Sequence, residues 1–295
     1  MLRRKTKMMS TKTPVDQVKP IRRPSHALGR LFLLLTPAAM VLSLAIPAPS
    51  AEAQPDVSPA RAALPIVAGT ELVGTKLDGS DGSCTAGPVL VPAGIFQRIT
   101  PYQNAVRYVV TAKHCFRNGD DIRAGGRHVG TIVWRSADSD LALVKVPPIQ
   151  DSSSPLRCST HSHAAFCSPI QSFTPMARGQ VFMFQRARTR PVPVQGSSDA
   201  PDERFCSSGA FSGILCVWHG ISIPADVVPT FRHVVAAEAN EGANIEVGDS
   251  GGPMLTYGAS LVGVISSRLA DRNIVLYTPM SQVLQELHGY RLAPA

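Results

Sequence analysis

The chemically most suggestive segment of this 295-residue chain is Gly248–Pro253, which reads GDSGGP. The hydroxyl of Ser250 is a weak nucleophile at neutral pH, so it would need a neighbouring base to accept its proton as it attacks a carbonyl carbon. Such an attack builds negative charge on the carbonyl oxygen, which backbone N–H groups aimed at that oxygen stabilise. Glycine at position 248 suits a backbone that turns sharply and approaches a substrate closely. A serine in a glycine-rich turn is common on its own, so Ser250 needs partners elsewhere in the chain.

Two further segments supply candidate partners for Ser250. Thr111–Cys115 (TAKHC) contains His114, and an unperturbed imidazole titrates near physiological pH, as a general base should. Asp140 begins the run Asp140–Val146 (DLALVKV), and a carboxylate beside such an imidazole fixes its tautomer and stabilises the imidazolium. The three residue types together can carry out acyl transfer with serine as the nucleophile.

These segments resemble the serine, histidine and aspartate motifs of chymotrypsin-type serine peptidases, and they occur in the chymotrypsin order, His, Asp, Ser. The resemblance implies a catalytic triad of His114, Asp140 and Ser250, with the N–H groups of Gly248 and Ser250 forming the oxyanion hole. Asp138 is the rival aspartate. The family's aspartate directly precedes an apolar strand that contains alanine, which favours Asp140. This mechanism needs no cofactor and no metal.

The elements that must position these residues are short strands. Between about residues 66 and 290, apolar runs such as Thr131–Trp134 and Leu261–Ile265 alternate with Gly, Pro, Asp and Ser, as strands and turns do. Helical periodicity is scarce before Met280–Leu287, so the pattern predicts an all-β barrel protein with one terminal helix. The resemblance implies two six-stranded antiparallel β-barrels with the active site between them and a C-terminal helix. It divides a peptidase domain at 66–290 into barrel one at about 66–148, barrel two at about 155–280 and the helix at about 280–290.

The first 53 residues have the pattern of a secretory signal peptide. A basic stretch precedes the apolar run Leu31–Ile46, and Ala51–Ala53 (AEA) fits the small-x-small pattern of a cleavage site. A membrane anchor is the alternative, but the run contains Pro37 and is shorter than a span of about 20 residues. We therefore expect a secreted protein, extracellular or periplasmic, without stable membrane anchoring after cleavage. Residues 54–65, rich in Pro and Ala, are predicted to be a linker or a short pro-segment.

Removal of this segment changes the charge of the protein. The chain has 29 Lys+Arg and 21 Asp+Glu residues, but residues 1–53 hold nine of the basic residues and two of the acidic ones. The remainder is nearly neutral, so no basic stripe indicates nucleic-acid binding. We expect a protein or peptide substrate, no nucleic-acid partner, and a monomer.

All six cysteines follow the signal, and an even number in an exported chain predicts disulfides. The resemblance implies a bond between Cys84 and Cys115, because in the family a cysteine next to the catalytic histidine bridges to an earlier strand. Proximity in sequence alone suggests the other pairs, which are Cys158–Cys167 and Cys206–Cys216.

The residues expected to bind substrate depart from the family pattern. Asn244 stands six residues before the nucleophile, where trypsin-like members carry aspartate, which argues against a preference for Lys or Arg. Ser266, Ser267 and Arg268 follow, where the family often has serine, an aromatic residue and glycine. Arg268 would obstruct the specificity pocket or favour acidic substrate groups. Lys113 stands where the family usually has Ala or Gly beside the base, and we expect it to point to solvent.

The segment Ile66–Gly69 (IVAG) bears on activation. It resembles the new N-terminus that animal members insert beside the aspartate preceding the nucleophile, here Asp249. Pro65 precedes it, where a basic residue would be expected, and other segments look more like bacterial members, which need no such insertion. We therefore expect a bacterial-type enzyme in which Asp249 has a different buried partner.

These observations predict a secreted serine endopeptidase that hydrolyses peptide bonds through an acyl-enzyme. Two alternatives stay open, because a fold can carry several functions. One is a non-catalytic binding protein on a peptidase scaffold, which the loss of a triad residue would mark. The other is a hydrolase dedicated to one partner protein or to an ester, which the unusual pocket residues favour.

Overall fold

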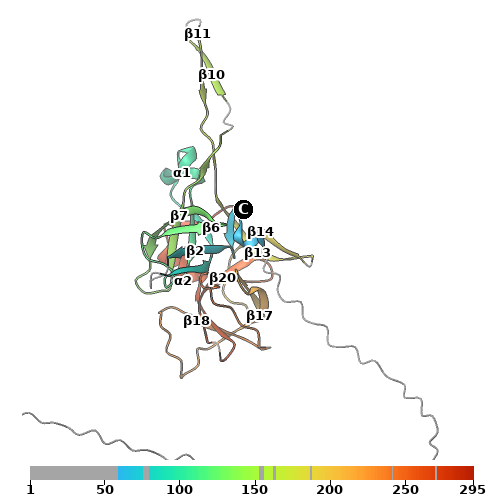
Figure 1. Cartoon of the computed structure of the whole chain (residues 1–295). Coiled ribbons are helices and arrows are strands. Elements are labelled where there is room, and N and C mark those ends of the chain that lie inside the picture. The colour runs from blue at the N-terminus through green and yellow to red at the C-terminus, as the bar shows by residue number, and fades with distance from the viewer. Residues whose placement is uncertain are drawn as a thin grey trace, which may run out of the picture. The chain divides into compact units, whose positions relative to one another are not determined.

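The computed structural model describes residues 59–75, 80–152, 156–161, 164–186, 188–240, 242–269 and 271–295. The predicted signal peptide at 1–53 lies outside these residues, as do residues 54–58 of the predicted linker. Strands dominate the described chain and form two barrels, which Figure 1 shows in teal to green and in brown to red. The all-β barrel fold predicted from the sequence is confirmed.

The first barrel consists of the strands between residues 71 and 146. Their order is β4-β5-β8-β7-β6-β2-β3, and neighbouring strands are antiparallel. Strand β3 continues towards β4 through Gly87, whose N–H donates to Val110 O at 2.8 Å, so the two act as one bent strand that closes a ring of six. The strands are β2 (Glu71–Thr75), β3 (Asp81–Thr85), β4 (Val89–Pro92), β5 (Arg107–Thr111), β6 (Asp121–Ala124), β7 (Arg127–Arg135) and β8 (Ala142–Val146).

Alternating side chains fill this barrel. In β6, Asp121 and Arg123 are exposed while Ile122 and Ala124 are fully buried, because successive strand residues point to opposite faces. The inward-facing residues form one apolar cluster with Phe116. Burial of the large side chains among them, such as Ile122 and Phe116, stabilises the fold by about 1.5–3 kcal/mol each, which gives the loops at the barrel's end a rigid support.

The second barrel is a closed ring of six antiparallel strands. Their order is β20-β19-β16-β17-β18-β21, and β21 pairs back with β20. Trp218 is fully buried in its core, where the indole N–H donates to Ser207 Oγ at 2.9 Å. The strands are β16 (Phe205–Gly209), β17 (Gly213–Ile221), β18 (Val235–Ala239), β19 (Pro253–Leu255), β20 (Ser260–Leu269) and β21 (Ile274–Pro279).

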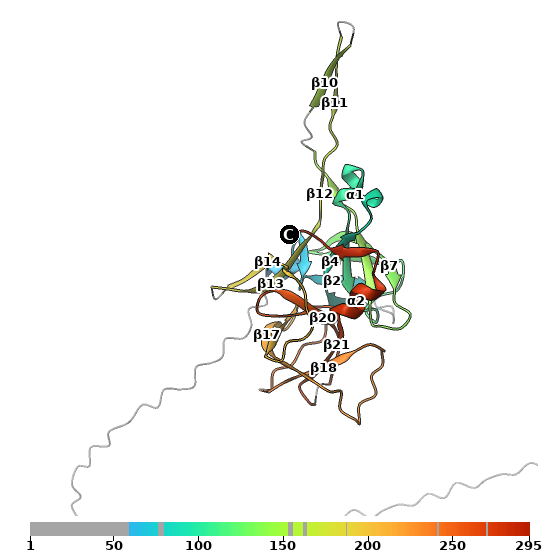
Figure 2. The same ribbon diagram turned by 180° about the vertical axis from the view of Figure 1, so that it is seen from behind.

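The terminal helix α2 (Met280–Glu286) joins the two barrels through a shared apolar cluster. Met280 and Val283 of the helix pack in this cluster with Leu143 of the first barrel and Val264 of the second. Figure 2 shows α2 beside β20, which fixes one barrel against the other. The helix is shorter than the sequence predicts, because it ends at Glu286 and residues Tyr290–Leu292 form strand β22, which pairs with β4.

Smaller elements surround the barrels. Strand β1 (Ile66–Ala68) pairs in parallel with β13 (Ala177–Gln185), which pairs with β14 (Arg188–Pro193). The others are η1 (Pro59–Ala62), η2 (Ile95–Arg98), α1 (Pro101–Ala105), β9 (Ile149–Gln150), β10 (Leu156–His161), β11 (Ala164–Pro169), β12 (Phe173–Thr174) and β15 (Gly196–Ser197).

Candidate active site

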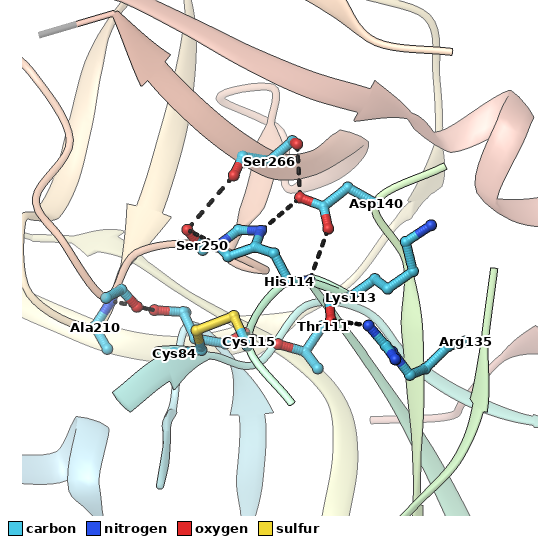
Figure 3. Close-up of a disulfide and its surroundings, with 12 residues drawn as sticks. Cys84, Thr111, Lys113, His114, Cys115, Arg135, Asp140, Ala210, Ser250 and Ser266 are labelled. Atoms are coloured by element: carbon cyan, nitrogen blue, oxygen red, sulfur yellow. Dashed lines mark hydrogen bonds and ion pairs between the residues drawn. A yellow bond between two sulfur atoms is a disulfide. The ribbon is translucent and has the colours of Figure 1, made fainter. Parts of the chain in front are cut away.

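The three predicted catalytic residues come from both barrels and meet in one place. His114 lies in the turn after β5, and Asp140 lies in the loop that leads into β8 of the same barrel. Ser250 lies in the loop before β19 of the second barrel. The side chains approach one another only because the barrels are packed together, as Figure 3 shows.

A continuous chain of polar contacts links the three side chains. His114 Nδ1 lies 2.7 Å from Asp140 Oδ2, and His114 Nε2 lies 3.1 Å from Ser250 Oγ. An ionised carboxylate only accepts hydrogen bonds, so it favours the tautomer with the proton on Nδ1. Nε2 is then free to accept the hydroxyl proton of Ser250. The imidazole side chain is 37% exposed, which leaves it accessible from solvent.

Asp140 is fully buried and held by three donors. Its Oδ1 accepts from the backbone N–H of His114 at 3.0 Å, and its Oδ2 also accepts from Ser266 Oγ at 2.7 Å. Hydrogen bonds to a carboxylate stabilise its charged form. Ser266, predicted as a substrate-binding residue, therefore orients the aspartate, and its carbonyl oxygen lies 3.5 Å from Ser250 Oγ.

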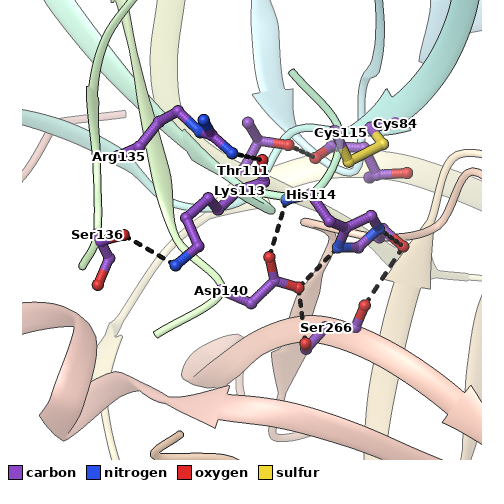
Figure 4. A network of polar contacts seen from close by, with 11 residues as sticks. Cys84, Thr111, Lys113, His114, Cys115, Arg135, Ser136, Asp140 and Ser266 are labelled. Atoms are coloured by element: carbon purple, nitrogen blue, oxygen red, sulfur yellow. Dashed lines mark hydrogen bonds and ion pairs between the residues drawn. A yellow bond between two sulfur atoms is a disulfide. The ribbon is translucent and has the colours of Figure 1, made fainter. Parts of the chain in front are cut away.

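The loop before Asp140 is anchored to helix α2 and to Lys113. Ser136 Oγ and Ser139 Oγ both donate to the carboxylate of Glu286, and Ser136 Oγ accepts from the N–H of Ser139 at 2.9 Å. Lys113 Nζ donates to Ser136 O at 2.9 Å (Figure 4). The expectation that Lys113 points to solvent is wrong, because the ammonium finds this carbonyl and also lies 5.2 Å from the ring centroid of Phe231.

Asp138, the rival aspartate, lies away from the imidazole. Its carboxylate is exposed and is 3.8 Å from Arg232 Nη1. The residue belongs to the solvent-facing side of the loop, which supports the choice of Asp140.

The loop Glu246–Gly252 carries the N–H groups of Gly248 and Ser250, which lie on either side of Asp249 in the sequence. Gly248 has a φ of 102°, and a Cβ atom at this position would lie 2.5 Å from the ring of Phe211, so only glycine fits. Thr85 fixes the loop, because its hydroxyl donates to Gly248 O at 2.8 Å and its N–H donates to Ser250 O at 2.8 Å. Within the described residues, the N–H groups of Gly248 and Ser250 have no acceptor. They are thus available to an oxygen atom beside Ser250.

Asp249 turns away from Ser250 into the second barrel, where it is fully buried. Its carboxylate accepts from the N–H groups of Phe211 at 2.8 Å, Ser212 at 3.2 Å and Glu246 at 2.7 Å. The N–H of Ile66 donates instead to Met176 O at 2.8 Å. Asp249 is therefore held from within the barrel, as expected for a chain without the N-terminal insertion.

A cleft of about 370 Å³ opens beside Ser250. Its lining includes Ser266, Ser267 and Arg268, three of the four predicted substrate-binding residues. Arg268 Nη1 donates to Ile245 O at 2.6 Å and lies 3.8 Å from Glu246 Oε2, so its side chain contacts two other residues that line the cleft. The lining does not include the fourth, Asn244, whose Oδ1 accepts the N–H of Ile245 at 2.9 Å.

Phe231 is a lining residue that the sequence did not reveal. Its ring stacks over the imidazole of His114 with 6.2 Å between ring centroids. The loop that carries it connects β17 to β18 in the second barrel but reaches the first barrel, where Arg232 N–H donates to Asp138 O at 3.3 Å. No local pattern in this Pro-rich loop indicates that contact.

The three disulfides join the pairs predicted from the sequence. Cys84 of β3 is bonded to Cys115, which fixes the turn that carries His114. These two sulfur atoms lie close to His114, but a disulfide offers no thiolate to a metal. The other bonds are Cys158–Cys167 and Cys206–Cys216.

Comparison with known proteins identifies the class. A family model described as a trypsin-like peptidase domain matches residues 97–264, a span that contains His114, Asp140 and Ser250. Because the match covers more than half of the chain, the chain belongs to the trypsin-like peptidases and is a serine-type peptidase. No curated protein sequence matches it.

Several solved bacterial peptidases have similar folds. Thermobifida fusca protease A is 19% identical, with a TM-score of 0.50, and the match covers 78% of this chain and 99% of that one. Nocardiopsis protease is 20% identical, with a TM-score of 0.47 and coverage of 77% and 98%. Cellulomonas bogoriensis chymotrypsin is 20% identical, with a TM-score of 0.47 and coverage of 78% and 99%.

In the described part of the chain, no helix is long and apolar enough to cross a membrane.

Proposed function

We propose that the protein is a secreted serine endopeptidase that cleaves peptide bonds through an acyl-enzyme. The observation that carries this proposal is the contact chain from buried Asp140 through His114 to Ser250. These distances lie within the hydrogen-bonding range that links a nucleophile, its base and the group that orients the base.

The proposed reaction begins when Ser250 Oγ attacks the carbonyl carbon of the substrate. His114 Nε2 takes the hydroxyl proton, and the charge of Asp140 stabilises the resulting imidazolium. The negative oxygen of the tetrahedral intermediate accepts hydrogen bonds from Gly248 N–H and Ser250 N–H. When the intermediate collapses, His114 gives its proton to the leaving amine. Water then attacks the acyl-enzyme with His114 again as the base, which releases the acid and regenerates Ser250.

Secretion is supported by the disulfides and by the signal pattern at 1–53. Disulfides persist in oxidising compartments, outside the cytosol, and all six cysteines are paired. We expect an extracellular or periplasmic monomer whose substrates are proteins or peptides.

A fluorophosphonate probe tests the proposed mechanism, since it reacts only with an activated serine. We expect the purified exported protein to be labelled, and the Ser250→Ala variant to remain unlabelled while keeping its fold. Labelling of the variant would refute the assignment of Ser250. A folded wild-type protein that resists the probe would instead indicate either a zymogen or a non-catalytic protein on a peptidase scaffold.

A further inference from the structure

Arg61 is a buried cation that the proposed reaction does not use. It lies in η1 (Pro59–Ala62), within the segment 54–65 that the sequence predicts to be a linker or pro-segment, yet it is only 2% exposed. A Pro- and Ala-rich linker would leave its arginine in solvent. Burial of a charged side chain is unfavourable unless partners compensate it, so the contacts of Arg61 need a reason.

The guanidinium is directed at the second barrel. Its Nη1 donates to Gly69 O at 3.0 Å, and both Nη1 and Nη2 lie 3.2 Å from Ser208 Oγ. The group also lies 4.7 Å from the ring centroid of Phe182. Burial lowers the pKa of Arg61 to about 10, and the charge of Asp249 opposes that shift. Arg61 therefore stays charged at neutral pH.

The contact with Ser208 leads to the nucleophile loop. Ser208 is followed by Gly209, where a Cβ atom would lie 2.2 Å from the carboxyl carbon of Asp249. Phe211 and Ser212, in the same stretch, donate their N–H groups to that carboxylate. Arg61 and Asp249 thus hold the same short segment. The described residues include no ion pair between Arg61 and Asp249, so the contacts that link them run through this segment.

Residues that follow Arg61 also pack against the first barrel. Gly125 packs against Ala62, since a Cβ atom at 125 would lie 2.6 Å from Ala62 O. Leu64 packs against the core of the first barrel. Removal of residues 59–65 would expose this surface and would remove the guanidinium that contacts Ser208.

We propose that Arg61 is a positioning residue for the nucleophile loop and that residues 59–65 remain part of the active enzyme. This inference rests on the proposed peptidase function. The guanidinium offsets the buried charge of Asp249 and fixes the segment Ser208–Ser212. Asp249 in turn holds Gly248 and Ser250, whose N–H groups face the reacting oxygen. Cleavage just before Ile66 would then inactivate the enzyme, whereas in animal members the corresponding cleavage activates it.

The first test compares Arg61→Met with Arg61→Lys in the full-length exported protein. Arg107→Met is the matched control, because Arg107 is also buried but donates to Asn104 O and Val106 O, away from Asp249. We expect Arg61→Met to lower kcat and the rate of fluorophosphonate labelling by about tenfold with KM nearly unchanged, since displacement of about 1 Å at a reacting centre can lower rates up to about 10²-fold. Arg61→Lys should recover part of the lost kcat and labelling rate. The labelling rate of Arg107→Met, divided by the fraction of that variant that is folded, should equal the wild-type rate.

The second test asks whether Arg61 acts through Asp249. In an Asp249→Asn background, Arg61→Met should cause little further loss, because coupled residues are non-additive. Independent, multiplying losses would overturn the inference, and so would wild-type labelling by Arg61→Met. Equal losses of labelling rate per folded protein in Arg61→Met and Arg107→Met would also overturn the inference. A folded wild-type protein that does not label would refute the proposed function and this inference together.

The intact mass of the active exported protein tests the inference without any variant. We expect its first residue to be at or before Pro59. An active form that begins at Ile66 would overturn the inference while leaving the proposed function intact.

Discussion

Substitution of Glu286 tests whether helix α2 supports the reacting residues of the first barrel. Its carboxylate accepts hydrogen bonds from the hydroxyl groups of Ser136 and Ser139. It also accepts one from the side-chain amide of Gln282, at 2.9 Å. A hydrogen bond to a charged group contributes about 1.5–3 kcal/mol. Glu286 is half-buried, so in the Glu286→Ala variant water would replace part of the lost hydrogen bonds. We therefore expect this substitution to lower the free energy of unfolding by about 2–3 kcal/mol at neutral pH. Because Ser139 directly precedes Asp140, we also expect kcat to fall about tenfold with KM unchanged.

The stability of the protein at acidic pH should depend on the ionisation of the Glu286 carboxyl group. Burial raises the pKa of Glu286, but hydrogen bonds from Ser136, Ser139 and Gln282, with the charge of His233, outweigh burial and leave the pKa below its ordinary value of 4.5. A carboxyl group whose pKa is lower in the folded state stabilises the fold above the unfolded pKa. That contribution is lost as the pH falls through the folded pKa. The wild type should therefore lose stability below about pH 4.5, and Glu286→Gln should lack this part of the loss.

Urea denaturation at neutral pH and at several acidic pH values, with steady-state kinetics, measures both effects. Gln285→Ala is the control, because it changes an exposed position of the same helix. A Glu286→Ala variant as stable as the wild type, or a Glu286→Gln variant with an unchanged acid profile, would refute the reasoning. Lost stability with unchanged kcat would show that α2 supports the fold without aligning Asp140.

Two further predictions concern the first barrel. Asp140→Asn should lower kcat by about 10⁴-fold, because the imidazole would take the wrong tautomer, whereas Asp138→Asn should have little effect; kinetics showing the reverse order would reassign the aspartate. Replacement of both Cys84 and Cys115 by serine should lower unfolding free energy by about 2–4 kcal/mol and slow labelling of Ser250 by freeing the turn that carries His114. Denaturation and probe labelling would measure these effects, and unchanged values would contradict a role for this disulfide.

The candidate catalytic residues could be predicted because each lies in a short sequence motif. His114, Asp140 and Ser250 are recognisable from their immediate neighbours, and strand alternation indicates the barrels. Asn244 was placed in the pocket by counting back from Ser250, but its side chain caps its own backbone and lies outside the cleft lining. Lys113 was assigned to solvent because the sequence does not show that Ser136 O lies within its reach.

The supporting residues could not be predicted, because their partners lie far away in the sequence. Arg61 meets Ser208 across 147 positions, and Glu286 meets Ser136 across 150. Composition assigns Arg61 to a linker, and the helical periodicity of Met280–Leu287 gives no indication of a partner for Glu286. Only the tertiary packing brings Arg61 to Ser208 and Glu286 to Ser136, the contacts through which we propose that they support the site.

Strand β22 has a consequence for when the first barrel can fold. Tyr290–Leu292 pair with β4, Ala293 N–H donates to Val89 O at 2.9 Å, and Gly179 N–H donates to Pro294 O at 2.8 Å. Tyr290–Leu292 therefore complete an edge of a barrel whose other strands lie between residues 71 and 146. Pairings between such distant segments form slowly. We expect the first barrel to reach its final structure only after Tyr290–Leu292 have been synthesised and have paired with β4.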